Sequence, residues 1–114
     1  MSACPICERG APLGVIAEHP YTWLTSRADP PSPGYVCVVN KRHVVEPFEL
    51  EGAERAAFWD DILDAAARIQ RALGSRKVNY EIHGNTIAHL HAHVFQRFDS
   101  APTHDLDVLR KALA

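Results

Sequence analysis

Three histidines alternate with apolar residues in the segment His89-Leu90-His91-Ala92-His93. In a β-strand, alternate residues share one face and lie about 6.6–6.8 Å apart. We therefore expect the three imidazoles to line one open face of a strand, while Leu90 and Ala92 face the core. A single histidine on a sheet is commonly structural, but three in strict alternation indicate a chemical site.

A metal centre is one interpretation of these histidines, because histidine is the commonest metal ligand. Ligands must lie about 2.0–2.1 Å from one ion, however, and a third imidazole in the same row reaches that ion less easily. The nearest acid downstream is Asp99. Covalent catalysis at phosphorus is the other interpretation, because neutral imidazole is a good nucleophile and its neighbours can hold protons or contact phosphate oxygens. The spacing alone does not separate the two.

Cysteines at two other places bear on the chemistry. Cys4-Pro5-Ile6-Cys7 has the Cys-x-x-Cys spacing that chelates zinc, although free thiols or a redox pair would fit the same four residues. Cys37 lies inside the apolar run Tyr-Val-Cys-Val-Val, and we expect it to be a small buried hydrophobic residue.

The elements that position these residues follow from hydrophobic periodicity and turn residues. Strands are expected at 15–18, 21–26, 35–39, 77–83 and 88–95. One long helix is expected at 53–73, ending at Gly74, and a short C-terminal helix is expected to start from an N-cap at Thr103. Strands on both sides of one long helix predict an α+β fold: an antiparallel sheet of about five strands packed with the two helices.

Composition limits the class of protein. The chain of 114 residues is expected to form a single domain over 1–114, with 46% hydrophobic and 23% charged residues, as in soluble proteins. A formal net charge of -2 gives no strong field for attracting nucleic acid. No apolar run reaches the ~20 residues that span a bilayer, and the N-terminus does not resemble a secretory signal. With three cysteines, we expect a cytoplasmic protein without a disulfide framework or an organic cofactor.

The segment 89–95 resembles the signature of the histidine triad (HIT) family, and the match is complete over seven residues. Other segments over about 4–97 resemble further motifs of the family: Cys4-Pro5-Ile6-Cys7, Ser32-Pro33-Gly34, Lys41-Arg42-His43-Val44, Asn79 and Gly84-Asn85-Thr86. The chain departs from the pattern at Tyr35, where a histidine often stands, at Asn40, where a proline is frequent, and at Gln96, where a proline is common.

The resemblance implies a HIT-like fold and a hydrolase or nucleotidyl transferase that cleaves at the α-phosphate of a nucleotide. By this analogy His91 attacks the phosphorus and forms a nucleotidyl-histidine, which then releases a nucleoside monophosphate. His93 would contact the phosphate and help to protonate the leaving group, and His89 would orient His91. Splitting one slow displacement into two steps, with the reactants held in place, is the source of the acceleration.

The same resemblance implies the substrate and the partners. Asn79, Asn85 and Thr86 would bind ribose and phosphate oxygens, adenine is the expected base, and the protein would be a homodimer. Dinucleoside polyphosphates and nucleoside phosphoramidates are both candidate substrates. The alternative is a nucleotide-binding or zinc-stabilised interaction module with little turnover, which would keep the fold and both asparagines.

The resemblance also bears on the possible zinc site. In some relatives the Cys-x-x-Cys pair is completed by two histidines, which correspond here to His43 and His89. Zinc held by Cys4, Cys7, His43 and His89 would be structural, because four protein ligands leave no open position for a substrate.

Overall fold

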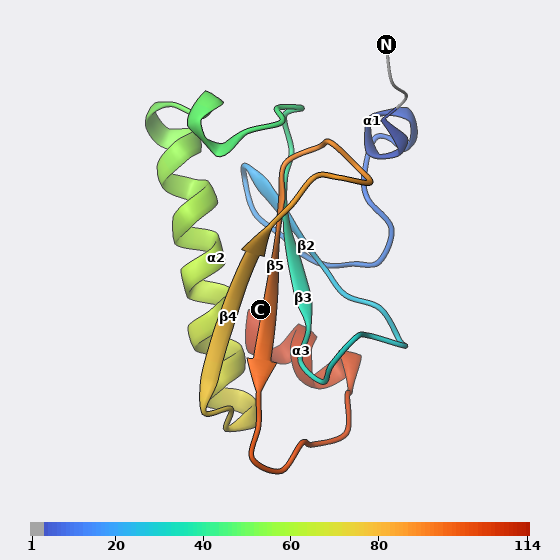
Figure 1. Cartoon of the computed structure of the whole chain (residues 1–114), viewed down its shortest axis with the longest axis vertical. Coiled ribbons are helices and arrows are strands. Elements are labelled where there is room, and N and C mark those ends of the chain that lie inside the picture. Colours follow the sequence, from blue (N-terminus) through green and yellow to red (C-terminus); the bar gives the residue numbers. More distant parts are fainter. Residues whose placement is uncertain (1–3) are drawn as a thin grey trace.

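The computed structural model describes residues 4–114, which form an α+β fold with one antiparallel sheet (Figure 1). The strands lie in the order β1-β2-β3-β5-β4, so β1 and β4 are the two edges. Their bounds are β1 Val15–Glu18, β2 Thr22–Thr25, β3 Val36–Asn40, β4 Lys77–Ile82 and β5 His91–Arg97. The helical segments are α1 Pro5–Arg9, η1 Pro47–Glu49, α2 Gly52–Leu73 and α3 Leu106–Leu113.

Alternation along the strands gives the sheet one apolar face and one face that carries the histidines. On the central strands β3 and β5, Val36 pairs with Val94 and Val38 with Ala92. All four of these side chains are buried in the core. The residues between them, which project to the opposite face, are paired as Cys37 with His93 and Val39 with His91.

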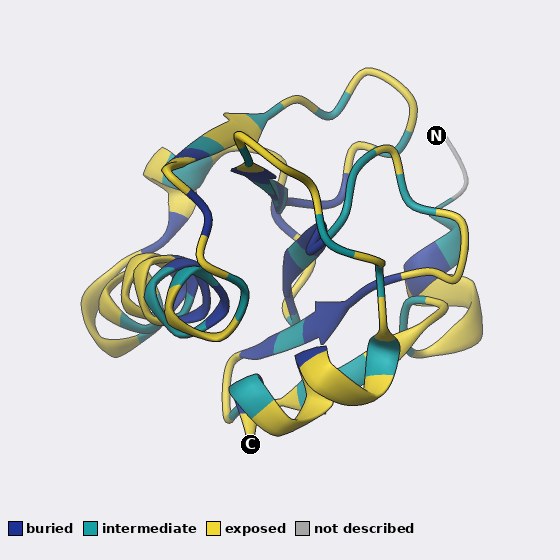
Figure 2. Cartoon of the chain, turned by 90° about the horizontal axis from the view of Figure 1, so that it is seen from below, coloured by how far each residue is buried: buried dark blue, intermediate teal, exposed yellow. Residues whose placement is uncertain are grey.

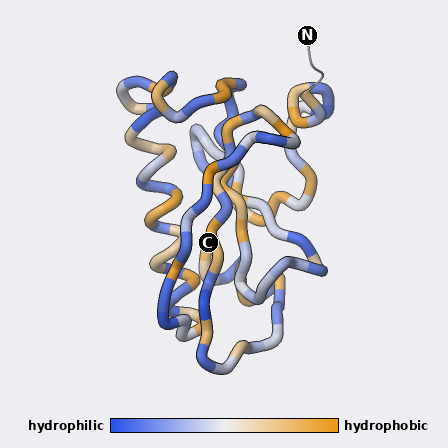
Figure 3. Tube along the Cα trace, viewed as in Figure 1, coloured by the Kyte–Doolittle hydropathy of each residue, from blue (hydrophilic) through white to orange (hydrophobic). Residues whose placement is uncertain are grey.

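The long helix α2 packs along the apolar face of the sheet. Its buried residues recur at helical spacing, and the trace alternates between hydrophobic and hydrophilic segments along the helix (Figure 3). The outward side of α2 is exposed and its inward side is buried, as the end-on view shows (Figure 2). Gly74 ends the helix with a φ of 73°, and its N–H donates to the carbonyl of Gln70, as the sequence predicts.

The predicted elements differ from the structure mainly at their boundaries. The last strand begins at His91 and not at residue 88. Leu90, just before it, accepts from the N–H of Asn40 at the end of β3 but donates to the carbonyl of Val44 in the loop after β3. The C-terminal helix is capped by Asp105, whose carboxylate accepts from two backbone N–H groups, so the expected cap at Thr103 is wrong. The short helices α1 and η1 were not predicted. In the part of the chain that the structure describes, no helix has both the length and the apolar character needed to cross a bilayer.

Candidate functional site

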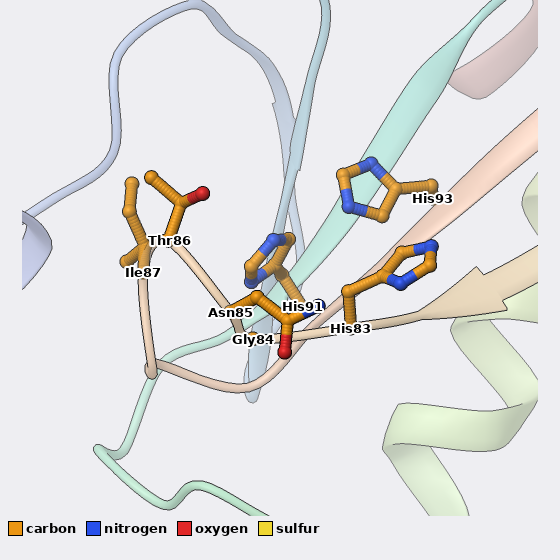
Figure 4. Close-up of a pocket in the computed structure, with 7 residues that line it drawn as sticks. All are labelled: His83, Gly84, Asn85, Thr86, Ile87, His91 and His93. Atoms are coloured by element: carbon orange, nitrogen blue, oxygen red, sulfur yellow. The ribbon is translucent and has the colours of Figure 1, made fainter.

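His91 and His93 lie on the sheet face that α2 leaves uncovered, where they border two adjoining pockets. The first pocket, of about 380 Å³, is formed with the loop between β4 and β5 (Figure 4). It is lined by His83, Gly84, Asn85, Thr86, Ile87, His91 and His93. Gly84 allows the loop to turn here, because its φ of 113° is rarely adopted by other residues.

The second pocket, of about 250 Å³, lies between the sheet and the segment that follows α1. Its lining is mostly apolar and comprises Ile6, Arg9, Pro12, Leu13, Thr25, Cys37, Val39, Ile87, His91 and His93. Both pockets share Ile87, His91 and His93. The two histidines therefore stand at the junction of a more polar and a more apolar cavity.

The imidazole of His91 is held by one backbone hydrogen bond. Its Nδ1 lies 2.7 Å from the carbonyl oxygen of His89, and a carbonyl can only accept. Nδ1 therefore carries the proton, and the lone pair of the neutral ring is on Nε2. His89 thus contacts His91 through its backbone carbonyl.

His93 has a different set of partners. Its Nδ1 lies 2.7 Å from the hydroxyl oxygen of Tyr35 and 3.4 Å from Sγ of Cys37. Burial lowers the pKa of His93 below its ordinary value, and charge on His91 or His83 would lower it further. The rings of His91 and His93 are edge to face, with centroids 4.9 Å apart.

His89 is not open to solvent beside the other two histidines, which corrects the expectation that all three imidazoles line an open face. It precedes β5, and its side chain is only 1% exposed. Its Nε2 donates to the carbonyl of Asn40 at 2.6 Å, so its Nδ1 holds a lone pair. Burial lowers the pKa of His89, which favours this neutral form.

The lone pair of His89 is directed toward three other side chains that can bind a metal. The cluster consists of Cys4, Cys7, His43 and His89, whose donor atoms all lie within 4.8 Å of one another. His89 Nδ1 lies 3.5 Å from Sγ of Cys4 and 3.6 Å from Sγ of Cys7. His43 Nδ1 lies 3.1 Å from His89 Nδ1 and 3.4 Å from Sγ of Cys7.

These distances match a tetrahedral zinc site. With zinc bond lengths typical of proteins, sulfur and nitrogen ligands lie about 3.6 Å apart and two nitrogen ligands about 3.3 Å apart. The hydrogen bond from His89 to Asn40 also orients that ring and fixes the tautomer that a metal requires. The four residues therefore fit a structural zinc ion, and they connect α1 to the chain before β5.

Of the three residues predicted to bind ribose and phosphate oxygens, two line a pocket and one does not. Asn85 and Thr86 line the first pocket, across from His91 and His93 (Figure 4). Asn79 lies on β4 opposite Phe95 and is not among the residues that line either pocket. Its part in ribose binding stays a prediction.

Three residues near the histidines were not predicted as part of the site. His83 lines the first pocket, and its Nε2 lies 2.8 Å from the carboxylate of Glu81. We expected Cys37 to be a buried core residue, and this is wrong. It faces the second pocket and contacts Tyr35. The departure of Tyr35 from the family pattern was visible in the sequence, but its contact with His93 was not.

The sheet with its long helix, and the pair of histidines between two cavities, define an α+β protein with a small-molecule site. The family model of the HIT domain matches residues 8–100. The chain belongs to the HIT family, whose members are nucleotide-binding hydrolases and transferases, and its fold is the HIT-like fold. No curated protein matches the chain at a significant level.

Solved structures of histidine triad proteins resemble the chain over most of its length. A hypothetical histidine triad nucleotide-binding protein from Sulfolobus tokodaii has a TM-score of 0.75 at 16% identity, over 96% of this chain and 89% of that one. A HIT protein from Sinorhizobium meliloti has a TM-score of 0.69 at 25% identity, over 89% and 73%. A zinc-bound histidine triad family protein from Mycobacterium smegmatis has a TM-score of 0.72 at 24% identity, over 97% and 93%.

The lowered pKa of His93 predicts that the protein loses stability in mild acid. The unfolded chain protonates this histidine near pH 6.5, whereas the folded protein protonates it only at lower pH. The unfolded state therefore binds more protons as the pH falls, and the free energy of unfolding decreases below about pH 6.5. Urea unfolding across a pH series should show this decrease, and a smaller one in His93→Gln. Equal pH dependence in both proteins would contradict the assignment.

Proposed function

We propose that the protein cleaves a nucleotide at its α-phosphorus and releases a nucleoside monophosphate through a nucleotidyl-His91 intermediate. The observation that carries this proposal is the hydrogen bond from His91 Nδ1 to the carbonyl of His89 at 2.7 Å. It leaves the Nε2 lone pair of His91 at the junction of the two pockets, which is what a nucleophile requires. Membership of the HIT family supports the reaction class.

In the first step, Nε2 of His91 forms a bond to the α-phosphorus and the bond from phosphorus to the leaving group breaks. Water then attacks the same phosphorus, the bond to His91 breaks, and the nucleoside monophosphate leaves with the oxygen of that water, while the proton of the water passes to solvent. His93 lies beside His91 and donates to the phosphate or to the bridging atom. The site accelerates the reaction chiefly by holding the phosphorus close to His91.

The two pockets are proposed to bind different parts of the substrate, the nucleobase in one and the phosphate in the other. The apolar pocket beside Ile6 and Leu13 suits a nucleobase, and the pocket beside Asn85 and Thr86 offers uncharged hydrogen-bonding groups for phosphate oxygens. A ribose contact from Asn79 and an adenine base belong to the proposal by family resemblance. Dinucleoside polyphosphates and nucleoside phosphoramidates are the two substrate classes.

Zinc held by Cys4, Cys7, His43 and His89 is proposed as the structural ion of this chain, since the zinc-bound relative from Mycobacterium smegmatis has the same fold. When bound it supplies a cross-link, because four protein ligands leave no position for a substrate. The described cysteines form no disulfide, which fits the cytoplasmic location that we propose.

The proposed function is tested by separating the products formed from a diadenosine polyphosphate and from adenosine 5′-phosphoramidate. Release of AMP from either substrate would support it. A protein that binds AMP tightly but releases no product from either substrate would be the alternative, a binding module without turnover. Loss of activity on chelation without any change in fold would instead favour a catalytic metal.

A homodimer is also part of the proposal, and its interface is predicted to include α2 and β4. Trp59 and Leu63 lie one turn apart on α2 and are 40% and 56% exposed, and Tyr80 on the edge strand β4 is 48% exposed. Pairing would cover these apolar groups. We expect sedimentation to give a dimer at micromolar concentration, and Leu63→Glu to give a monomer. Val108→Glu, on α3, should stay dimeric. A monomeric wild-type protein would exclude the dimer.

A further inference from the structure

Tyr35 and Cys37 form a small cluster at Nδ1 of His93. The tyrosine precedes β3, and Cys37 on β3 is the cross-strand partner of His93 on β5. The hydroxyl of Tyr35 lies 2.7 Å from Nδ1 of His93 and 2.8 Å from Sγ of Cys37. The Nδ1 atom of His93 thus contacts side chains, whereas Nδ1 of His91 contacts a backbone carbonyl.

Tyr35 is buried, and both its hydroxyl and the Cys37 thiol keep their protons. Tyr35 is 8% exposed, and its ring packs against that of Phe95 with centroids 5.0 Å apart. Burial raises the pKa of the Tyr35 hydroxyl and also the pKa of the Cys37 thiol. Both groups are therefore protonated near neutral pH, and each has one hydrogen to donate.

The direction of the hydrogen bonds follows from donor and acceptor strength. A phenol is a strong donor, the imidazole nitrogen is the strongest acceptor within its reach, and a thiol is weak in both roles. The favoured arrangement has Cys37 donating to Tyr35 and Tyr35 donating to Nδ1 of His93. This leaves the hydrogen of His93 on Nε2, the opposite tautomer to that of His91.

We propose that Tyr35 is a positioning residue that keeps His93 as a neutral Nε2–H donor, so that the site prefers leaving groups that depart as stable anions. This inference rests on the proposed function and names its substrate class as dinucleoside polyphosphates. A neutral imidazole donates a hydrogen bond but is a poor acid, because its own proton is lost only far above the working pH.

The preference follows from the balance of protons in the first step. When His91 displaces a nucleoside polyphosphate, the electron pair of the broken P–O bond stays on a phosphate oxygen, which is stable without a proton. The Nε2–H of His93 needs only to donate a hydrogen bond to that oxygen. When the leaving group is an amine, the electron pair stays on nitrogen, which must also gain a proton. A neutral His93 does not supply that proton readily.

The tautomer is tested first, because that test does not depend on any activity. In protein labelled with nitrogen-15 at histidine, long-range proton–nitrogen spectra distinguish the two neutral tautomers. We expect the Nε2–H form for His93 in the wild type and a mixture in Tyr35→Phe. Phenylalanine keeps the packing on Phe95, and the amide spectrum reports whether the fold is intact. The Nδ1–H form in the wild type would overturn the proposal.

The kinetic test compares kcat/KM for a diadenosine polyphosphate and adenosine 5′-phosphoramidate. We expect the wild type to favour the polyphosphate at least tenfold, and Tyr35→Phe to lose about ten- to hundredfold in kcat on it, with little change in KM. Tyr35→His, which offers a second imidazole to His93, should have a higher kcat on the phosphoramidate than the wild type. Tyr21→Phe, at an exposed position, is the matched control.

The outcomes separate this inference from the function on which it rests. A wild-type protein that cleaves the phosphoramidate equally well or faster would overturn the preference while the proposed function stands. Unchanged kcat in Tyr35→Phe on both substrates would overturn the role of Tyr35. No AMP from either substrate would overturn the proposed function and the preference with it.

Discussion

Replacing His91 with asparagine is expected to lower kcat by about 10⁴- to 10⁶-fold, as the loss of a covalent nucleophile does in other enzymes. The physical reason is that neither of the other two histidines of the segment can replace His91 as the nucleophile. His93 is held through its Nδ1 by Tyr35, and His89 is buried beside the cysteines. AMP release in single-turnover experiments, with enzyme in excess over substrate, measures the chemical step directly.

The control for this variant is His19→Asn, because His19 lies outside β5 and lines neither pocket. It should keep the wild-type rate. His91→Asn should also keep its fold and its metal content, which circular dichroism and metal analysis report, since His91 is not one of the four clustered residues. A His91→Asn protein with wild-type kcat would end the covalent mechanism.

Removal of zinc is expected to lower the thermal unfolding midpoint by roughly 10–20 °C. An ion present at a thousandfold its Kd stabilises the folded state by about 4 kcal/mol, and each kcal/mol shifts Tm by several degrees in a chain of this length. Cys4→Ser should purify without metal and show a similar loss. Calorimetry with and without a chelator, together with metal analysis, checks both expectations.

The consequence for activity should appear mainly in KM. Bound zinc would anchor α1 to the chain before β5, and Ile6 and Arg9 of α1 line the apolar pocket. His91 itself is held by a backbone carbonyl and should keep its orientation. Cys37→Ser is the matched control for metal content, because Cys37 lies outside the cluster. A protein that purifies without zinc and has the same Tm with chelator would show that the four residues bind no ion.

The histidine segment shows what local sequence could and could not predict. Alternation correctly placed His91 and His93 on one face of a strand. It failed for His89, which is buried and precedes the strand. Leu90 accepts from the N–H of Asn40 at the end of β3 but donates to the carbonyl of Val44 in the next loop, and β5 starts three residues later than predicted. Periodicity reports side-chain alternation, but it does not report where a strand begins to pair.

Long-range contacts account for most of what the sequence did not reveal. The metal cluster joins residues 85 positions apart, and only the family resemblance brought them together. The contact between Tyr35 and His93 depends on the register of β3 against β5, which no local pattern specifies. The long helix, by contrast, was predicted to within one residue, because its amphipathic spacing and Gly74 are local signals.

The stereochemical course at the α-phosphorus is the most direct test of the covalent mechanism. A substrate made chiral there with sulfur and an oxygen isotope is hydrolysed in isotopically labelled water, and the configuration of the released monophosphate is determined. Two successive displacements, first by His91 and then by water, predict retention of configuration. Inversion would mean that water attacks the phosphorus in a single step, and it would contradict a nucleotidyl-His91 intermediate.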